Sequence, residues 1–147
     1  MTRVDVVTAR LRREEGRQPL PYNDATGHTV TCRPNGNLTV GYGCDLEFGL
    51  DDEEMEWLLA HRVAKADAVL VAYAWYPPLD EPRASVLLDL AYNEGAHFLL
   101  HFPKMLAALA VGAWKTAADE LLDSDAAREL PTRYGPLAQI LLTGRLQ

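Results

Sequence analysis

Cysteine is scarce in this sequence, and no long apolar run occurs. Only Cys32 and Cys44 are present among 147 residues, and their spacing matches neither a zinc-ligand motif nor a redox motif. We expect two free thiols, while a disulfide between them stays open because both flank one predicted hairpin. No apolar run approaches the roughly 20 residues that span a bilayer, so the sequence predicts no membrane insertion.

Positive charge is also in short supply. The chain has 14 Lys and Arg against 21 Asp and Glu, which gives a formal net charge of −7. Such a balance repels nucleic acid, and we expect no nucleic-acid partner. Residues 1–5 lack the apolar core of a signal peptide. We therefore expect synthesis in the cytosol without an export signal.

What the chain does have is enough apolar residues for one core. Hydrophobic residues make up 48% of a sequence whose length is typical of a single domain. Val4, Val7 and Leu11 recur at helical spacing, which predicts an N-terminal helix over 3–15. Gly16 follows and permits a left-handed turn at the end of that helix.

The composition changes to Gly, Thr, Asn and Val from residue 21 to residue 46. Short alternating stretches at 28–31 and 38–40 flank the turn-forming residues 33–37. This segment therefore predicts a small antiparallel sheet.

A long helix is predicted from Asp52 to Tyr76. Asp51 can cap its start together with Glu54, apolar residues then repeat every 3.6 positions, and a Pro-Pro pair at 77–78 ends it. The remainder reads as helical, with apolar faces that should form most of the core. Three tryptophans fall within the predicted helices and are expected to pack in the core: Trp57, Trp75 and Trp114.

Two acidic residues near the N-terminus could serve hydrolytic chemistry or could be ordinary solvated acids near the end of a helix. Inverting hydrolysis of a glycosidic bond needs one carboxylic acid and one carboxylate roughly 6.5 to 9.5 Å apart. Glu15 and Asp24 lie nine residues apart with a chain reversal between them. Spacing alone does not establish the pair, and Glu14 competes equally with Glu15 because both lie equally near the apolar stripe of their helix.

Three ordered blocks resolve that choice, because they resemble the phage-type lysozymes, the T-even-phage endolysin family or glycoside hydrolase family 24. The blocks are LRREEG at 11–16, YNDATG at 22–27 and LTVGYG at 38–43. They occur in the family's order and keep its nine-residue gap between the two acids. The resemblance continues more weakly through 90–95, 114–119 and 131–133, and so covers nearly the whole chain.

The resemblance implies a set of catalytic roles. Glu15 would be the general acid, Asp24 would hold or deprotonate the attacking water, and Thr39 would help to place that water beneath the sugar ring. Arg133 matches the family position whose guanidinium pairs with the catalytic acid. A surface arginine beside a helix cap is the simpler alternative for Arg133.

The resemblance also implies residues that bind the sugar. Tyr92 and Asn93 fall where the family has an aromatic and an amide lining the cleft, although Tyr92 is equally consistent with a core position. Gly41 and Gly43 would shape the cleft floor, because glycine lets a backbone pass close to a ligand.

The fold that this resemblance implies is α+β and lysozyme-like within a single domain over 1–147. A small sheet-bearing lobe over about 16–50 would be joined by a linking helix over about 51–76 to a helical lobe over about 77–147, which also takes the helix 3–15. Some features depart from the family. The hairpin over 28–38 is longer, and Cys44 replaces the His or Arg of many relatives.

The implied function is an endolysin that hydrolyses the bond between N-acetylmuramic acid and N-acetylglucosamine and so lyses bacteria. We expect it to bind peptidoglycan glycan strands as a monomer, with no cofactor or metal, and to need a holin-type pore to reach the wall or periplasm from the host cytoplasm. A lytic transglycosylase needs only one acid, so Asp24 and Thr39 argue against it. A wall-binding module without catalysis is the third reading.

Overall fold

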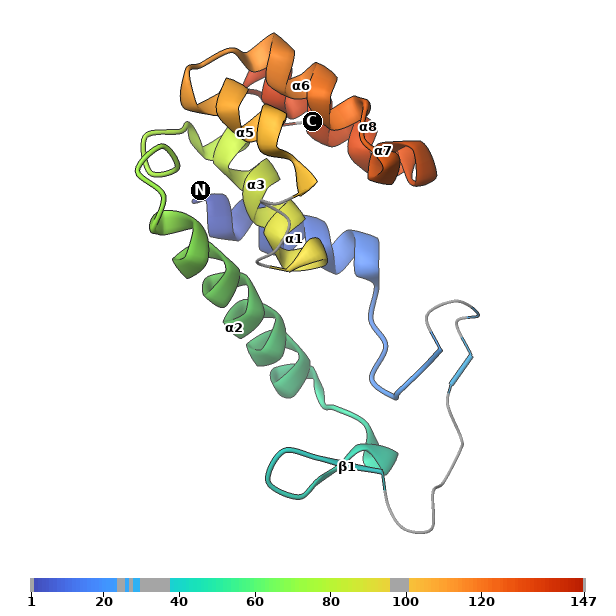
Figure 1. The fold of residues 1–147 in the computed structure, drawn as a ribbon. Coiled ribbons are helices and arrows are strands. Elements are labelled where there is room, and N and C mark those ends of the chain that lie inside the picture. The colour runs from blue at the N-terminus through green and yellow to red at the C-terminus, as the bar shows by residue number, and fades with distance from the viewer. Residues whose placement is uncertain (1, 24–25, 27, 30–37, 96–100, 147) are drawn as a thin grey trace.

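A computed structural model describes residues 2–23, 26, 28–29, 38–95 and 101–146 (Figure 1). These residues form seven α-helices, one short 3₁₀ helix and one two-stranded sheet. The protein is therefore mostly helical with a small sheet, a composition compatible with a lysozyme-like α+β fold. Residues 30–37, which contain the predicted hairpin turn and Cys32, lie outside the described residues.

Helix α1 (Arg3–Glu15) has the predicted bounds. Thr2 and Asp5 form a capping box, in which each side chain accepts from the other residue's backbone N–H and satisfies a donor that the first turn leaves unpaired. Val7 and Leu11 are buried on the inner face. The helix ends at Gly16, whose φ of 72° is positive but whose ψ of −175° is extended, so the expected left-handed turn is only half present.

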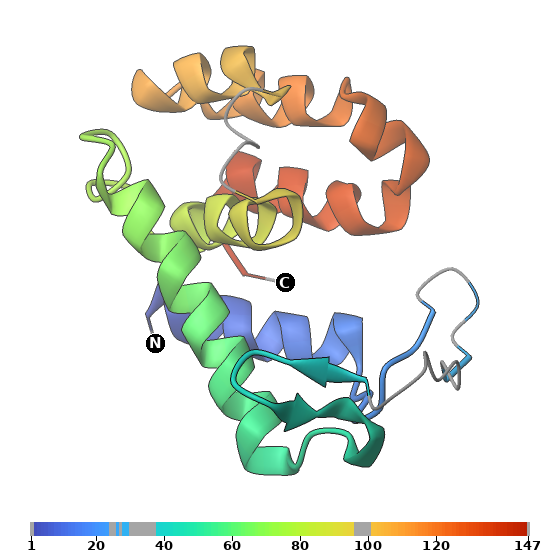
Figure 2. The same cartoon turned by 60° about the horizontal axis from the view of Figure 1, so that its bottom comes forward.

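The sheet is antiparallel, as predicted. Strands β1 (Thr39–Val40) and β2 (Cys44–Asp45) pair with Thr39 opposite Asp45, and Leu46 N donates to Leu38 O at 2.8 Å beyond them. The 3₁₀ helix η1 (Leu46–Phe48) follows directly. Figure 2 shows this hairpin beside the first turns of the α-helix that begins at Asp52.

Helix α2 (Asp52–Val71) begins as predicted, with a capping box between Asp51 and Glu54. Its predicted end at Tyr76 is wrong, because the helix stops at Val71 and the chain continues in turns. Those turns return Tyr76 to the core, where its ring is fully buried and its hydroxyl donates to Asp67 Oδ1 at 2.8 Å. A straight helix would forgo that burial.

Helix α3 (Glu81–Glu94) is the centre of the core. It packs against α1, α2 and α8 (Pro131–Thr143), and all eight residues from 84 to 91 are buried. A helix surrounded in this way needs apolar residues on every side. Ser85 and Asp89 are the two polar exceptions within this run.

The C-terminal helices complete the core. Helix α5 (Pro103–Ala110) packs against α6 (Trp114–Leu122), which in turn packs against α8, and α7 (Asp125–Glu129) also lies against α8. The predicted apolar faces are largely buried, although Leu122 is 45% exposed. Among the helices of the described ranges, none combines the length and apolar character that crossing a membrane requires.

The tryptophans differ from one another. Trp75 and Trp114 are partly buried against the core, and Arg83 lies over the Trp114 ring at 4.2 Å. Core packing is wrong for Trp57, which is 64% exposed and stacks on His61 with ring centroids 5.0 Å apart. Trp57 is two positions after Met55, which puts it on the side of α2 opposite the apolar stripe.

Candidate active site

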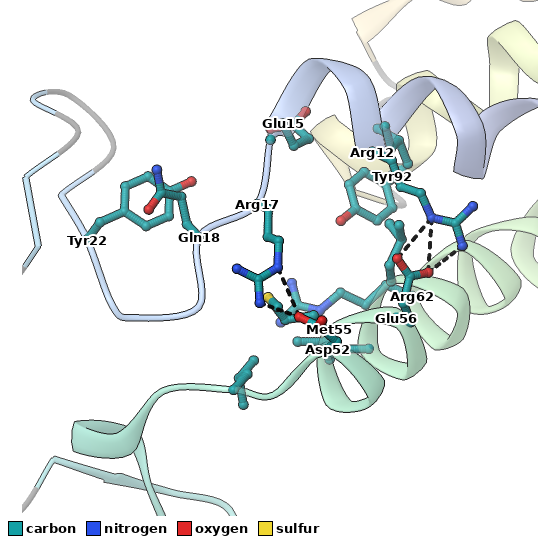
Figure 3. Close-up of a pocket in the computed structure, with 15 residues that line it drawn as sticks. Arg12, Glu15, Arg17, Gln18, Tyr22, Asp52, Met55, Glu56, Arg62 and Tyr92 are labelled. Atoms are coloured by element: carbon teal, nitrogen blue, oxygen red, sulfur yellow. Dashed lines mark hydrogen bonds and ion pairs between the residues drawn. The ribbon is translucent and has the colours of Figure 1, made fainter.

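A pocket of about 710 Å³ opens where the end of α1 approaches the first half of α2. Figure 3 shows that the residues around it come from α1, from the segment after α1, from α2 and from α3. Its lining residues are Leu11, Arg12, Glu15, Gly16, Arg17, Gln18, Tyr22, Leu50, Asp52, Met55, Glu56, Leu58, Leu59, Arg62 and Tyr92.

The two competing acids at the end of α1 face different surroundings. Glu15 lines this pocket together with Tyr92. Glu14 lines another pocket of about 390 Å³, beside Arg13 and α8. Only Glu15 is therefore placed where a ligand of the larger pocket could meet it.

Arg133 of α8 binds the Glu15 carboxylate. Its Nη1 donates to Glu15 Oε1 at 3.1 Å, and its Nη2 donates to Asp89 Oδ1 at the same distance. Burial works to lower the pKa of Arg133, but the charges and hydrogen bonds of Asp89 and Glu15 outweigh it and raise that pKa. The guanidinium stays charged and bridges the two carboxylates.

Tyr92 provides the aromatic face of the pocket. Its ring is half-buried on α3, and the pKa of its hydroxyl is raised, chiefly by burial, with the negative charge of Glu15 adding to the effect and Arg62 opposing it. The hydroxyl is therefore neutral and can donate. A neutral aromatic beside a carboxylate suits a sugar ring, which offers both apolar faces and hydroxyl groups.

Three arginines line a pocket in a chain that is acidic overall. Arg12 Nε donates to both carboxylate oxygens of Glu56 at 3.0 Å, and Arg17 Nε donates to Asp52 Oδ1 at 3.0 Å. The dashed lines in Figure 3 mark these pairs. Arg62 is the third arginine of the lining. The three cations offset the three acids of the lining, so the pocket is locally balanced despite the net charge of −7.

The lining of this pocket does not include the other predicted site residues that the structure describes. Asn93 Nδ2 donates to Asp89 Oδ1 at 3.0 Å and to Asp89 O at 2.8 Å. The amide group is therefore bound to the preceding turn of its own helix, α3. Thr39 opens β1, and Gly41 and Gly43 form the exposed turn between the strands. Both glycines have positive φ, 61° and 91°, and a Cβ on either would meet nothing within 4 Å among the described residues, so the turn geometry is what requires glycine here.

The predicted base Asp24 lies outside the described residues, as does Gly27 of the same block. The described residues on either side are hydrogen-bonded to one another. Thr26 N donates to Asn23 O at 3.2 Å, and Asn23 N donates to His28 O at 2.9 Å.

Asp89 and Arg10 were missed by the sequence analysis. The Asp89 side chain is completely buried, and Arg10 Nη1 donates to its Oδ2 at 3.0 Å. One signal was available, because Asp89 interrupts the apolar run from Val86 to Ala91. An ionisable residue within a buried helix face is rarely found without a partner.

No group of three or more His, Cys, Asp or Glu side chains could hold a metal ion within the part of the chain that is described. The family model described as phage lysozyme matches residues 12–132. Comparison with curated proteins finds no match.

Proposed function

Because the chain belongs to the phage lysozyme family, we propose that it is an endolysin that hydrolyses the β-1,4 bond between N-acetylmuramic acid and N-acetylglucosamine. The family supports a glycosidase that acts on peptidoglycan. The position of Glu15 carries the proposal, since this residue lines the 710 Å³ pocket together with Tyr92 while Arg133 binds its carboxylate.

The proposed mechanism is inverting. Glu15 gives its proton to the glycosidic oxygen as the bond to C1 of the muramic acid breaks, so the glucosamine leaves as a neutral alcohol. Asp24 removes a proton from a water molecule on the opposite face of the ring, and Thr39 orients that water. The water oxygen bonds to C1, and one water is consumed for each bond cleaved.

The proposal includes the lobe arrangement. The segment over about 16–50 would form one wall of the substrate cleft, the helix over about 51–76 would link the lobes, and the helical lobe over about 77–147 with helix 3–15 would form the other wall. The pocket lining supports this arrangement because it draws Arg17 and Tyr22 from the first segment and Tyr92 from the helical part. Glycan strands would lie across Gly41 and Gly43 and reach Tyr92 and Asn93.

Product chemistry tests this function directly. Purified protein is incubated with peptidoglycan, and the new sugar ends and their anomeric form are analysed. Hydrolysis with inversion yields a reducing muramic acid that is first released as the α-anomer. A 1,6-anhydro ring would mean transglycosylation instead, and binding without any new ends would mean a wall-binding module.

Asp24→Asn separates hydrolysis from the alternatives that need one acid. The substitution should lower the rate of hydrolysis by at least about 100-fold, the size expected for removal of a base. Asp45→Asn, at the end of β2, is the matched control. An Asp24→Asn protein that kept full activity would contradict the assignment of the base.

The biological role follows from the substrate. The enzyme would act as a monomer, be made in the host cytoplasm, reach the wall through a holin-type pore and cause cytolysis. Expression with and without such a pore tests the route, because lysis is expected only when both are present. Activity should persist in a chelator, since the proposed chemistry uses neither metal nor cofactor.

A further inference from the structure

Helix α3 carries a polar stripe that runs from two buried residues, Ser85 and Asp89, to the exposed Asn93. Ser85, Asp89 and Asn93 follow one another at intervals of four residues, which puts them on one side of the helix. That side meets Arg10 of α1 and Arg133 of α8. Three helices thus meet at the Asp89 carboxylate.

Both oxygens of that carboxylate are occupied. Oδ1 accepts from Arg133 Nη2 at 3.1 Å and from Asn93 Nδ2 at 3.0 Å, while Oδ2 accepts from Arg10 Nη1 at 3.0 Å. Arg10 is itself steadied by a 3.4 Å contact from Nη2 to Ser85 Oγ. The side chain is 0% exposed, and two cations are paired with it.

The charges around Asp89 leave one positive charge available to the candidate active site. Two guanidinium groups meet one carboxylate at Asp89, so one positive charge is uncompensated there. Arg133 Nη1 directs it to Glu15 Oε1 at 3.1 Å, with Glu14 Oε2 farther away, 3.9 Å from Nη2. Because the guanidinium is planar, fixing Nη2 on Asp89 also sets the direction in which Nη1 donates.

We propose that Asp89 is a positioning residue for catalysis, which anchors the Arg133 guanidinium and thereby orients the Glu15 acid, with Arg10 as the buried counter-charge. This inference rests on the proposed function. The side chain of Asp89 is fully buried, that of Arg133 is 22% exposed and that of Glu15 is 45% exposed. The contacts therefore lead from the buried Asp89 through Arg133 to the exposed Glu15.

A double-mutant cycle on kcat tests the proposal. Asp89→Asn supplies one acceptor oxygen where two are needed, and its amide NH₂ faces a guanidinium, so Arg133 should lose its orientation. We expect kcat on peptidoglycan to fall by about tenfold with KM little changed. In an Arg133→Met background the same substitution should change kcat by less than about twofold, because Asp89 acts through Arg133.

Asp67→Asn is the matched control. Asp67 also accepts a hydrogen bond from a buried side chain, Tyr76, but it lies on α2 away from Arg133. We expect this variant to lower the melting temperature and to change kcat by less than about twofold in both backgrounds. An equal fall in kcat for Asp89→Asn with and without Arg133 would overturn the proposal.

NMR of the arginine side chains tests whether Asp89 anchors Arg133, and it needs no activity measurement. The comparison of wild type with Glu15→Gln remains informative even if Asp89→Asn does not fold. In wild type the Arg133 Nη groups, identified by their loss in Arg133→Met, should rotate slowly. They should remain slow in Glu15→Gln and become fast in a folded Asp89→Asn. Fast rotation in Glu15→Gln would show that Glu15 holds Arg133, and the proposal would fail.

The outcomes separate the two levels of inference. A wild-type protein that releases no sugar ends but keeps a rigid Arg133 in Glu15→Gln defeats the proposed function and leaves the anchor standing. An active wild type with a mobile Arg133 retains the function and overturns the anchor.

Discussion

Arg133 Nη1 donates to Glu15 Oε1 at 3.1 Å, although the two residues are 118 positions apart in the sequence. The contact joins the first turn of α8 to the last residue of α1. Its consequence is that the orientation of the proposed acid depends on the correct docking of a C-terminal helix. Changes in α8 should therefore alter activity without touching the substrate.

Glu15→Gln should lower the rate of peptidoglycan hydrolysis by at least about 100-fold, because an amide has no proton to give to the leaving oxygen. Reducing-end assays measure the rate. Glu14→Gln is the control, since it removes the same charge from the same helix end on the side away from the main pocket. We expect Glu14→Gln to keep at least about a third of the wild-type rate. Comparable losses in both variants would refute the choice of Glu15.

Arg62→Gln should raise KM for peptidoglycan by about two- to fivefold with kcat little changed, because one exposed charge contributes up to about 1 kcal/mol. Arg62 lines the pocket beside Tyr92, and peptidoglycan is anionic. The loss should shrink at high salt, where charges are screened. Arg13→Gln makes the same change of net charge outside the main pocket. An equal rise in KM for Arg13→Gln would mean that net charge, and not the place of Arg62, sets binding.

Tyr76→Phe should reduce the free energy of unfolding by about 1 to 2 kcal/mol at neutral pH, because it removes the hydrogen bond that the buried hydroxyl donates to Asp67 Oδ1. Urea unfolding measures the change. Tyr73→Phe is the control, since Tyr73 is 39% exposed, and it should change stability by less than about 0.5 kcal/mol. A Tyr76→Phe protein as stable as wild type would contradict the assigned hydrogen bond.

Stability should fall at alkaline pH, in part through Tyr76. Burial, followed by the hydrogen bond to Asp67, raises the pKa of Tyr76 well above its ordinary value of 10.0. A raised folded-state pKa stabilises the protein fully below the unfolded pKa, and the stabilisation is lost as the pH rises from about 10 toward the folded value.

Unfolding free energies measured from pH 9 upward check this dependence. Above pH 10 the wild type should lose up to about 1.4 kcal/mol per pH unit more than Tyr76→Phe, because only its unfolded state releases that proton. Tyr73→Phe should follow the wild-type slope. Parallel curves for wild type and Tyr76→Phe would disprove the linkage.

Local patterns were sufficient to predict where α1 and α2 begin. The caps at Thr2 and Asp51 and the apolar stripe of α1 were readable because they involve neighbours within a few residues. The end of α2 was not readable. It depends on the burial of Tyr76 beneath Arg3, whose guanidinium lies 4.7 Å from the ring centroid and comes from another helix.

The proposed acid, Glu15, was likewise only partly determined by the sequence. By itself the sequence determined that an acid ends α1, and the ordered motif blocks favoured Glu15, but helical periodicity could not separate it from Glu14. Tertiary packing put Glu15 in the pocket with Tyr92 and Glu14 outside it. Tertiary packing alone also brought Arg10 and Arg133 to the buried Asp89, because the partners of a charge on one helix depend on which faces of the other helices dock against it.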